Sequence, residues 1–166
     1  MGVAGCGKSS LGAAVAAQAG LKLIEGDDHH SAQSLIKMRS GVPLTDSDRE
    51  SWLEAISQEI SDQPMGLVVT CSALKLAYRE RLRTAAPGLL FVYLDIDKAQ
   101  ALARVTERAA SHFFSTSLVD SQFAILEPPI LEAGVLRIDA LASTAQQQAQ
   151  VCTWLSTQSQ APIQQA

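Results

Sequence analysis

The sequence predicts an α/β fold in which helices cover both faces of a parallel sheet. Residues 67–71 (LVVTC) and 89–94 (LLFVYL) form continuous apolar or β-branched runs, which are typical of parallel strands buried on both faces. Segments with helical patterning separate such runs, and crossovers of that kind join parallel strands. The chain has 166 residues, of which 47% are hydrophobic and 18% charged, so it is long enough for one globular domain with an ordinary core.

The first third of the chain alternates between predicted helices and a predicted strand. Residues 11–19 are rich in alanine, which favours a helix. The short apolar run 21–24 predicts a buried strand that ends at an acidic turn. Residues 31–40 predict a short helix, which the Gly-Val-Pro sequence at 41–43 breaks.

The middle of the chain predicts a longer helix, a strand and another helix. Thr45 or Asp46 can cap the longer helix, and carboxylates in its first turn favour that end of the helix dipole. The strand at 67–71 precedes a helix at 75–85. The buried face of the longer helix is predicted to consist of Trp52, Leu53, Ile56 and Ile60.

The remaining elements complete the alternation. A polar segment at 109–117 interrupts them and has the character of a mobile lid. We expect one domain over residues 1–157 and a flexible, Gln- and Ser-rich tail at 158–166. The predicted elements after residue 88 are a strand at 89–94, helices at 97–108 and 118–125, a strand at 135–138 and a helix at 143–155.

Composition excludes several classes of protein. The net charge of −4 argues against a nucleic-acid-binding protein, which would carry a basic face. No apolar run is long enough to cross a membrane, and no secretory signal is recognisable. The three cysteines, Cys6, Cys71 and Cys152, lack metal-ligand spacing and indicate reduced thiols, so we expect a cytoplasmic protein.

Residues 2–9 (GVAGCGKS) carry the most informative motif, G-x-x-x-x-G-K-[ST], which binds phosphate. Its glycines let backbone N–H groups turn toward an anion, and the helix that follows places its positive end there. Lys8 is predicted to reach the β- and γ-phosphates of a nucleotide, and the Ser9 hydroxyl to ligate Mg²⁺. Cys6 is most simply a small residue that the loop tolerates.

A strand should precede this motif, but only Met1 comes before Gly2. We therefore expect the first strand of the sheet to be missing from this chain, either because the chain is clipped or because its start is assigned too late. Such a strand lies at the centre of the sheet in folds of this class, so its absence would expose the edges of two neighbouring strands.

Asp27 follows the second predicted strand, at the edge of the sheet where ligands bind. A carboxylate there can orient or deprotonate an attacking hydroxyl group, and the alternative is that it caps the following helix. His29 and His30 are adjacent, so their side chains diverge and do not indicate a metal site.

Two pairs of basic residues four apart are candidates for ligand binding, Lys75 with Arg79 and Arg104 with Arg108. Each pair projects from one helical face and could bind a carboxylate or a phosphate, or could simply form a solvated basic surface. Arg49 has the same two interpretations.

Taken together, these stretches resemble the gluconokinase family, small P-loop kinases related in fold to shikimate and nucleoside monophosphate kinases. MGVAGCGKS is similar to the family's MGVSGSGKS, and GDDHH followed by KMRSGVPLTDSDRESWL is similar to G-D-x-x-H-P and K-M-x-x-G-x-P-L-x-D-x-D-R-x-x-W-L. CSALKLAYRERLR resembles C-S-A-L-K-x-x-Y-R-x-x-L-R, and HFFSTSLVDSQFAILEPP resembles H-F-x-x-x-x-L-x-x-S-Q-F-x-x-L-E-x-P.

The resemblance implies a P-loop kinase fold and ATP-dependent phosphorylation of D-gluconate to 6-phospho-D-gluconate, with Mg²⁺ and as a homodimer. It implies Lys8, Asp27 and Arg108 as catalytic residues. The residues implied to bind the nucleotide are Gly2, Gly5, Cys6, Gly7, Lys8, Ser9, Ser10, Arg104 and Arg108, with Ser9 on the metal. Those implied to bind gluconate are Asp27, His30, Lys37, Arg49, Lys75, Arg79 and His112.

The chain departs from the family pattern at a few positions. Ser31 replaces a proline, Ser34 replaces an asparagine, and the stretch from Arg108 to His112 is one residue longer. Two alternatives remain open: a kinase for another small hydroxy acid of the shikimate kind, and a truncated, non-catalytic nucleotide-binding remnant.

Overall fold

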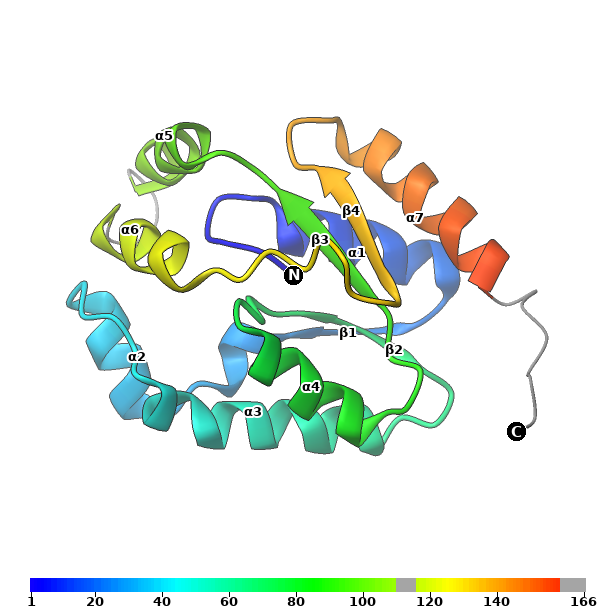
Figure 1. Cartoon of the computed structure of the whole chain (residues 1–166), viewed down its shortest axis with the longest axis horizontal. Helices are drawn as coiled ribbons and strands as arrows, with labels where there is room; N and C mark the ends of the chain where they lie inside the picture. The colour runs from blue at the N-terminus through cyan, green and yellow to red at the C-terminus, as the bar shows by residue number, and fades with distance from the viewer. Residues whose placement is uncertain (110–115, 159–166) are drawn as a thin grey trace.

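The computed structural model describes residues 1–109 and 116–158, which form parallel strands flanked by helices (Figure 1). The strands are β1 (Lys22–Glu25), β2 (Leu67–Thr70), β3 (Phe91–Asp95) and β4 (Val135–Asp139). The helices are α1 (Lys8–Ala19), α2 (Ala32–Arg39), α3 (Asp46–Ser61), α4 (Leu76–Ala85), α5 (Lys98–Ala109), α6 (Thr116–Ile125) and α7 (Thr144–Gln158), with a 3₁₀ helix η1 (Gly26–His29) after β1.

The four strands form two parallel pairs. β1 pairs with β2 from Lys22 opposite Leu67, and β3 pairs with β4 from Phe91 opposite Val135. The parallel pairing confirms the predicted sheet type. In the described residues no strand precedes α1.

The backbone of the first two residues joins the two strand pairs. Leu94 donates its backbone N–H to the Met1 carbonyl at 3.0 Å, and Gly2 donates to the Ser72 carbonyl at 3.1 Å. Figure 1 shows the N-terminus between β3 above and β1 below. The phosphate-binding motif therefore starts from the middle of the fold.

Both faces of β3 are buried, as its continuous apolar sequence predicts. Phe91 and Tyr93 pack into a core cluster with α3 and α4, whereas Val92 and Leu94 face a second cluster formed with α1, α5 and α7. Alternate residues of a strand point to opposite faces, so the two clusters lie on the two sides of the sheet. This arrangement confirms that helices cover both faces.

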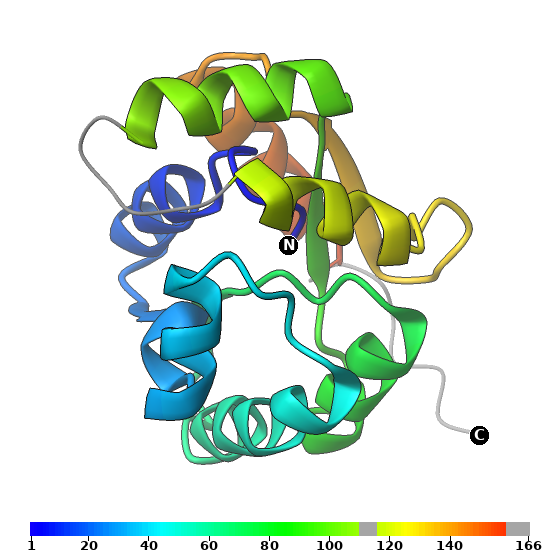
Figure 2. The same ribbon diagram turned by 90° about the vertical axis from the view of Figure 1, so that its left-hand side faces the viewer.

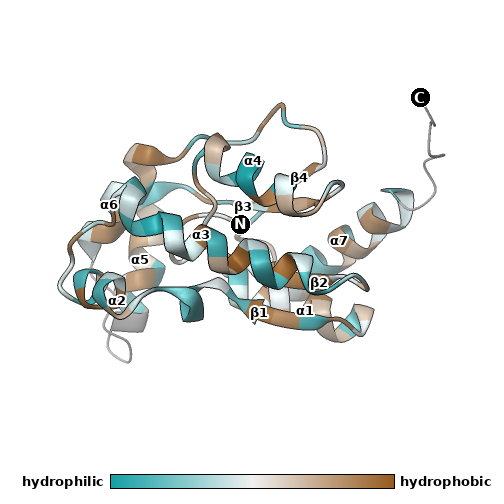
Figure 3. Cartoon of the chain, turned by 90° about the horizontal axis from the view of Figure 1, so that it is seen from below, coloured by the Kyte–Doolittle hydropathy of each residue, from teal (hydrophilic) through white to brown (hydrophobic). Residues whose placement is uncertain are grey.

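Local sequence determines where α2 and α3 begin. The Thr45 hydroxyl accepts from the Asp48 backbone N–H while the Asp48 carboxylate accepts from Thr45, and this capping box starts α3. Ser31 caps α2 by accepting from the Ser34 N–H at 3.1 Å. Hydrophilic and hydrophobic residues alternate along α3, which buries one face (Figure 3).

Several predicted boundaries differ from the structure by one to three residues, and two of them have a clear local cause. The strand predicted from residue 89 begins at Phe91, because Leu89 donates its N–H to the Ala86 carbonyl in a turn. The helix predicted from residue 75 begins at Leu76, with Lys75 in an extended conformation as its N-cap. The predicted lid at 109–117 and the tail at 158–166 lie mostly outside the described residues. None of the helices described is both long and apolar enough to span a membrane.

Candidate active site

A cleft of about 570 Å³ opens where the phosphate-binding motif meets the carboxyl ends of β1 and β2. Figure 2 shows α2 and α3 on one side of the N-terminal segment and α5 and α6 on the other. The cleft brings together many of the residues predicted from the sequence. Those that line it are Gly5, Gly7, Lys8, Ser9, Ser10, Asp27, His30 and Arg49.

The phosphate-binding motif has a backbone that only glycine adopts without strain at three positions. The φ angles are 137° at Gly2, 81° at Gly5 and 98° at Gly7. A Cβ at Gly5 would lie 2.8 Å from the Ala101 carbonyl oxygen, so this loop packs closely against α5. Gly7 caps α1 without a side-chain hydrogen bond, which leaves the first N–H groups of that helix directed at the cleft.

Two side chains beside this loop fit the demands of a polyphosphate and a divalent cation. Lys8 donates its ammonium group to the Val3 carbonyl at 2.9 Å, which holds the lysine over its own loop. Ser9 donates its hydroxyl to the Glu25 carboxylate at 2.9 Å, and Thr70 donates to the same carboxylate. A hydroxyl next to a carboxylate is the oxygen donor set that Mg²⁺ prefers.

Glu25 is a site residue that the sequence reasoning missed. It is the last residue of β1 and lines the cleft two positions before Asp27. Its position at the carboxyl end of a buried strand was a usable signal, since ligands gather at that edge of a parallel sheet.

The turn after β1 carries Asp27 and His30 into the cleft. Asp27 is exposed there, and Ser31 rather than Asp27 caps α2, so the alternative that Asp27 is a helix cap is wrong. The Nδ1 atom of His30 is buried without a hydrogen-bond partner among the described residues. Burial lowers the pKa of His30, and the Asp27 carboxylate partly opposes that shift, which favours a neutral imidazole.

Arg49 comes from the first turn of α3 and reaches the cleft while being 9% exposed. It donates to the Leu44 carbonyl, and its guanidinium carbon lies 5.9 Å from the centre of the Tyr78 ring. A nearly buried cation that retains free donors on a cleft is suited to bind a carboxylate.

Lys75 and Lys37 do not line the cleft, contrary to their expected role in binding substrate. Lys75 forms an ion pair with Asp46 at 2.7 Å, and its ammonium nitrogen lies 5.7 Å from the centre of the Tyr78 ring. Lys37 forms an ion pair with Asp48 at 2.6 Å. Both lysines therefore support the elements that carry Arg49.

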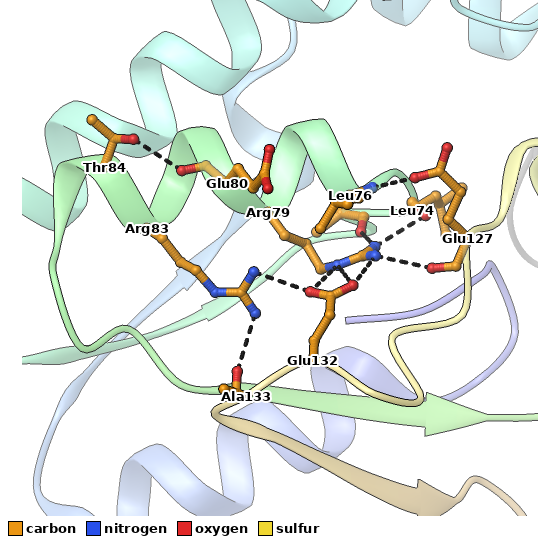
Figure 4. A network of polar contacts seen from close by, with 10 residues as sticks. Leu74, Leu76, Arg79, Glu80, Arg83, Thr84, Glu127, Glu132 and Ala133 are labelled. Atoms are coloured by element: carbon orange, nitrogen blue, oxygen red, sulfur yellow. Dashed lines mark hydrogen bonds and ion pairs between the residues drawn. The ribbon is translucent and has the colours of Figure 1, made fainter.

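The expectation that Arg79 contacts the substrate is wrong. Its side chain is 1% exposed, and its guanidinium forms an ion pair with Glu132 (Figure 4). The same group donates to the Ala73 carbonyl at 2.8 Å and to the Glu127 carbonyl at 3.0 Å. All of these partners are protein groups, so Arg79 is structural.

Arg104 lies at the other end of the phosphate-binding loop, in a second cavity of about 320 Å³. It donates to the Ala140 carbonyl at 3.0 Å and to the Gly5 carbonyl at 3.4 Å. Cys6, Gly7 and Ser10 also line this cavity. The Arg108 side chain and His112 lie outside the part of the chain that the structure describes, so their expected roles stay predictions.

Gln122 is a second cleft residue that the sequence reasoning left without a role. Ala4 donates its backbone N–H to the Gln122 side-chain carbonyl at 2.6 Å. Gln122 lines the cleft, and among the residues that the structure describes its amide nitrogen donates no hydrogen bond. Gln122 belongs to the S-Q-F stretch that matches the family pattern, and this match could have indicated a role in the site.

The ion pair between Lys37 and Asp48 should make the folded protein less stable in acid. The Lys37 ammonium and the capping bonds from Thr45 lower the pKa of Asp48 from 3.8 to about 2. The pair therefore stabilises the fold above pH 3.8, and this contribution disappears as the pH falls toward 2. We expect wild type to have the higher free energy of unfolding above pH 3.8. The difference between wild type and Asp48→Asn should shrink as the pH falls from 3.8 toward 2, which unfolding curves recorded against pH would measure. Parallel curves for the two proteins would contradict the prediction.

Sequence comparisons show that the chain is similar to known small-molecule kinases. The family model described as shikimate kinase matches residues 4–151. The chain is 42% identical to the thermosensitive gluconokinase of Escherichia coli K12, over 84% of this chain and 76% of that protein. It is 38% identical to the gluconokinase of Gluconobacter oxydans, over 83% and 79% of the two chains.

The solved structures to which the chain is similar are also kinases. A gluconokinase from Sinorhizobium meliloti 1021 superposes with a TM-score of 0.83 at 39% identity, covering 96% of this chain and 94% of that one. A sugar kinase from Janibacter sp. HTCC2649 gives a TM-score of 0.88 at 34% identity, covering 94% and 91%. A deoxyadenosine kinase from M. mycoides, at 14% identity, with 95% and 97% covered and a TM-score of 0.65, shares the fold.

Proposed function

The chain belongs to the shikimate kinase family and to the gluconokinases within it, and from this premise we propose that it phosphorylates D-gluconate to 6-phospho-D-gluconate with ATP. One observation carries the proposal: a single cleft is lined by Lys8 and Ser9 and also by Asp27, His30 and Arg49. Gluconate is an anion with several hydroxyl groups. A cation and polar groups beside a phosphate-binding loop match that chemistry.

On the nucleotide side, Lys8 and the N-terminal amides of α1 would hold the phosphates of ATP. Ser9 and Glu25 would hold Mg²⁺, which when bound neutralises charge that develops on the phosphates. Arg104 and the cavity beside Gly7 would receive the rest of the nucleotide. Gly2 and Gly5 would contribute through their backbone shape.

On the acceptor side, Arg49 would pair with the gluconate carboxylate, and His30, kept neutral, would hydrogen-bond a hydroxyl group. Asp27 would orient the reacting hydroxyl and take its proton. The hydroxyl oxygen then forms a bond to the γ-phosphorus as the bond from that phosphorus to the β–γ bridging oxygen breaks, and ADP leaves. The homodimer, the single domain over 1–157 and the cytoplasmic location stay predictions.

The test is acceptor-dependent release of ADP. We expect release with ATP, Mg²⁺ and D-gluconate, little release with shikimate or without an acceptor, and loss of the gluconate-dependent rate in Lys8→Met. Release that depends on shikimate rather than gluconate would identify a kinase for another small acid. ATP binding with no acceptor-dependent release would identify a nucleotide-binding remnant.

A further inference from the structure

We propose that Trp52 is a positioning residue, which holds the turn at residues 26–30 so that Asp27 and His30 face the cleft. The sequence alone indicates an ordinary core residue on the buried face of α3. The inference rests on the proposed function, because it assigns Trp52 to the acceptor side of that site. Two separate contacts from one side chain carry it.

The first contact is a hydrogen bond to the start of the turn. The Trp52 indole nitrogen donates to the Gly26 carbonyl at 2.7 Å, and the Trp52 side chain is 1% exposed. The accepting carbonyl belongs to the peptide bond that leads into Asp27. A buried bond at this place has no competition from water, so it fixes the orientation of that peptide plane.

The second contact is a stack at the end of the turn. The rings of Trp52 and His30 have their centroids 5.0 Å apart and are inclined by 8°. Stacking fixes the plane of the imidazole, and the Nδ1 atom of His30 is already buried without a partner among the described residues. Nε2 is therefore the nitrogen of His30 through which a ligand in the cleft can be bound.

The turn gains little support from its own hydrogen bonds, although Gly26 at its start packs closely against Thr70 and Cys71. η1 is one short 3₁₀ helix, whose closing bond from the His30 N–H to the Asp27 carbonyl is long, at 3.4 Å. Trp52, by contrast, comes from a helix of 16 residues that begins with a capping box. One side chain of α3 thus contacts both ends of the turn and restrains them relative to that helix.

Steady-state kinetics of the full chain separate a positioning role from a merely structural one. Trp52→Phe keeps an aromatic face for His30 but removes the indole N–H, and we expect kcat/KM for gluconate to fall by about 10- to 100-fold, since small misplacements of a catalytic group cost that much. KM for ATP should not change, because the contacts that Trp52→Phe alters are with Gly26 and His30, on the acceptor side of the proposed site. Leu53→Ala is the matched control: Leu53 is 4% exposed on the same helix, and its loss should lower stability while the folded enzyme keeps its kcat.

A second measurement decides the proposal even if the wild type does not phosphorylate gluconate, an outcome that would refute only the proposed function. Proton NMR reports the ring resonances and the pKa of His30 in the free protein. The pKa is lowered by burial, with Asp27 opposing and Arg49 and His29 reinforcing the shift. In Trp52→Leu the resonances should lose the ring-current shift and the pKa should return toward its ordinary value, whereas Leu53→Ala should leave both unchanged. An unaltered His30 in Trp52→Leu, or an unaltered kcat/KM for gluconate in an active Trp52→Phe, would overturn the assignment.

Discussion

Replacing Asp27 with asparagine is expected to lower kcat for gluconate phosphorylation by about 10²- to 10⁴-fold, the range for loss of a general base. The amide keeps the size and much of the hydrogen bonding of the carboxylate but cannot take the proton of the acceptor hydroxyl. Asp27 is exposed on the cleft, so the melting temperature should barely change. Stopped or continuous assays of ADP release at saturating ATP and gluconate would measure the effect.

Asp28 provides a matched control for this substitution. It is the neighbouring carboxylate, is also exposed, and is not part of the cleft lining. Asp28→Asn makes the same change in net charge, so general electrostatic effects on the anionic substrates should appear in both variants. If Asp27→Asn kept the wild-type kcat, or if Asp28→Asn lost as much, Asp27 would not be the base.

Replacing Arg79 with methionine is expected to lower the free energy of unfolding by about 3–5 kcal/mol, the usual result of removing one partner of a buried ion pair. Arg79 at present holds the pKa of the Glu132 carboxyl below its ordinary value, and without it Glu132 would be left with the partly exposed Arg83 as its partner. The carbonyls of Ala73, Leu74 and Glu127 would lose donors as well (Figure 4). Denaturant unfolding curves of the two proteins would give the difference.

Arg83→Met is the control for this second prediction. Arg83 lies one turn further along α4 and contacts the same Glu132 carboxylate at 3.0 Å, but its side chain is 26% exposed. Its guanidinium is already partly hydrated, so its loss should cost much less than that of Arg79. Equal destabilisation by the two substitutions would mean that burial of the Arg79 pair is not what stabilises this region.

Local signals in the sequence predicted the backbone shape of residues 2–9 well and the positions of the basic side chains poorly. The glycines, Lys8 and Ser9 are placed by backbone shape and by the start of one helix, so the eight consecutive residues 2–9 contain the information. The pairing of Lys75 with Arg79 assumed that both lie in one helix. α4 begins at Leu76, which leaves Lys75 as an extended N-cap.

Long-range partners explain the remaining errors. The Glu132 that neutralises Arg79 is 53 residues away along the chain, and the Asp46 that neutralises Lys75 is 29 residues away. Spacing within a segment contains no information about such partners. Trp52 illustrates the same limit, since its helical periodicity correctly predicts burial but not the contacts with Gly26 and His30 that lie 26 and 22 positions earlier.

Two tethers attach the phosphate-binding loop to the helices on either side of residues 110–115. Arg104 of α5 holds the Gly5 carbonyl, and Gln122 of α6 holds the Ala4 N–H. Neighbouring peptides of the loop are thereby tied to α5 and to α6. A shift of either helix would pull on the main chain of residues 4 and 5, so under the proposed function we expect substitutions that displace α5 or α6 to change the affinity for ATP even where they do not touch it.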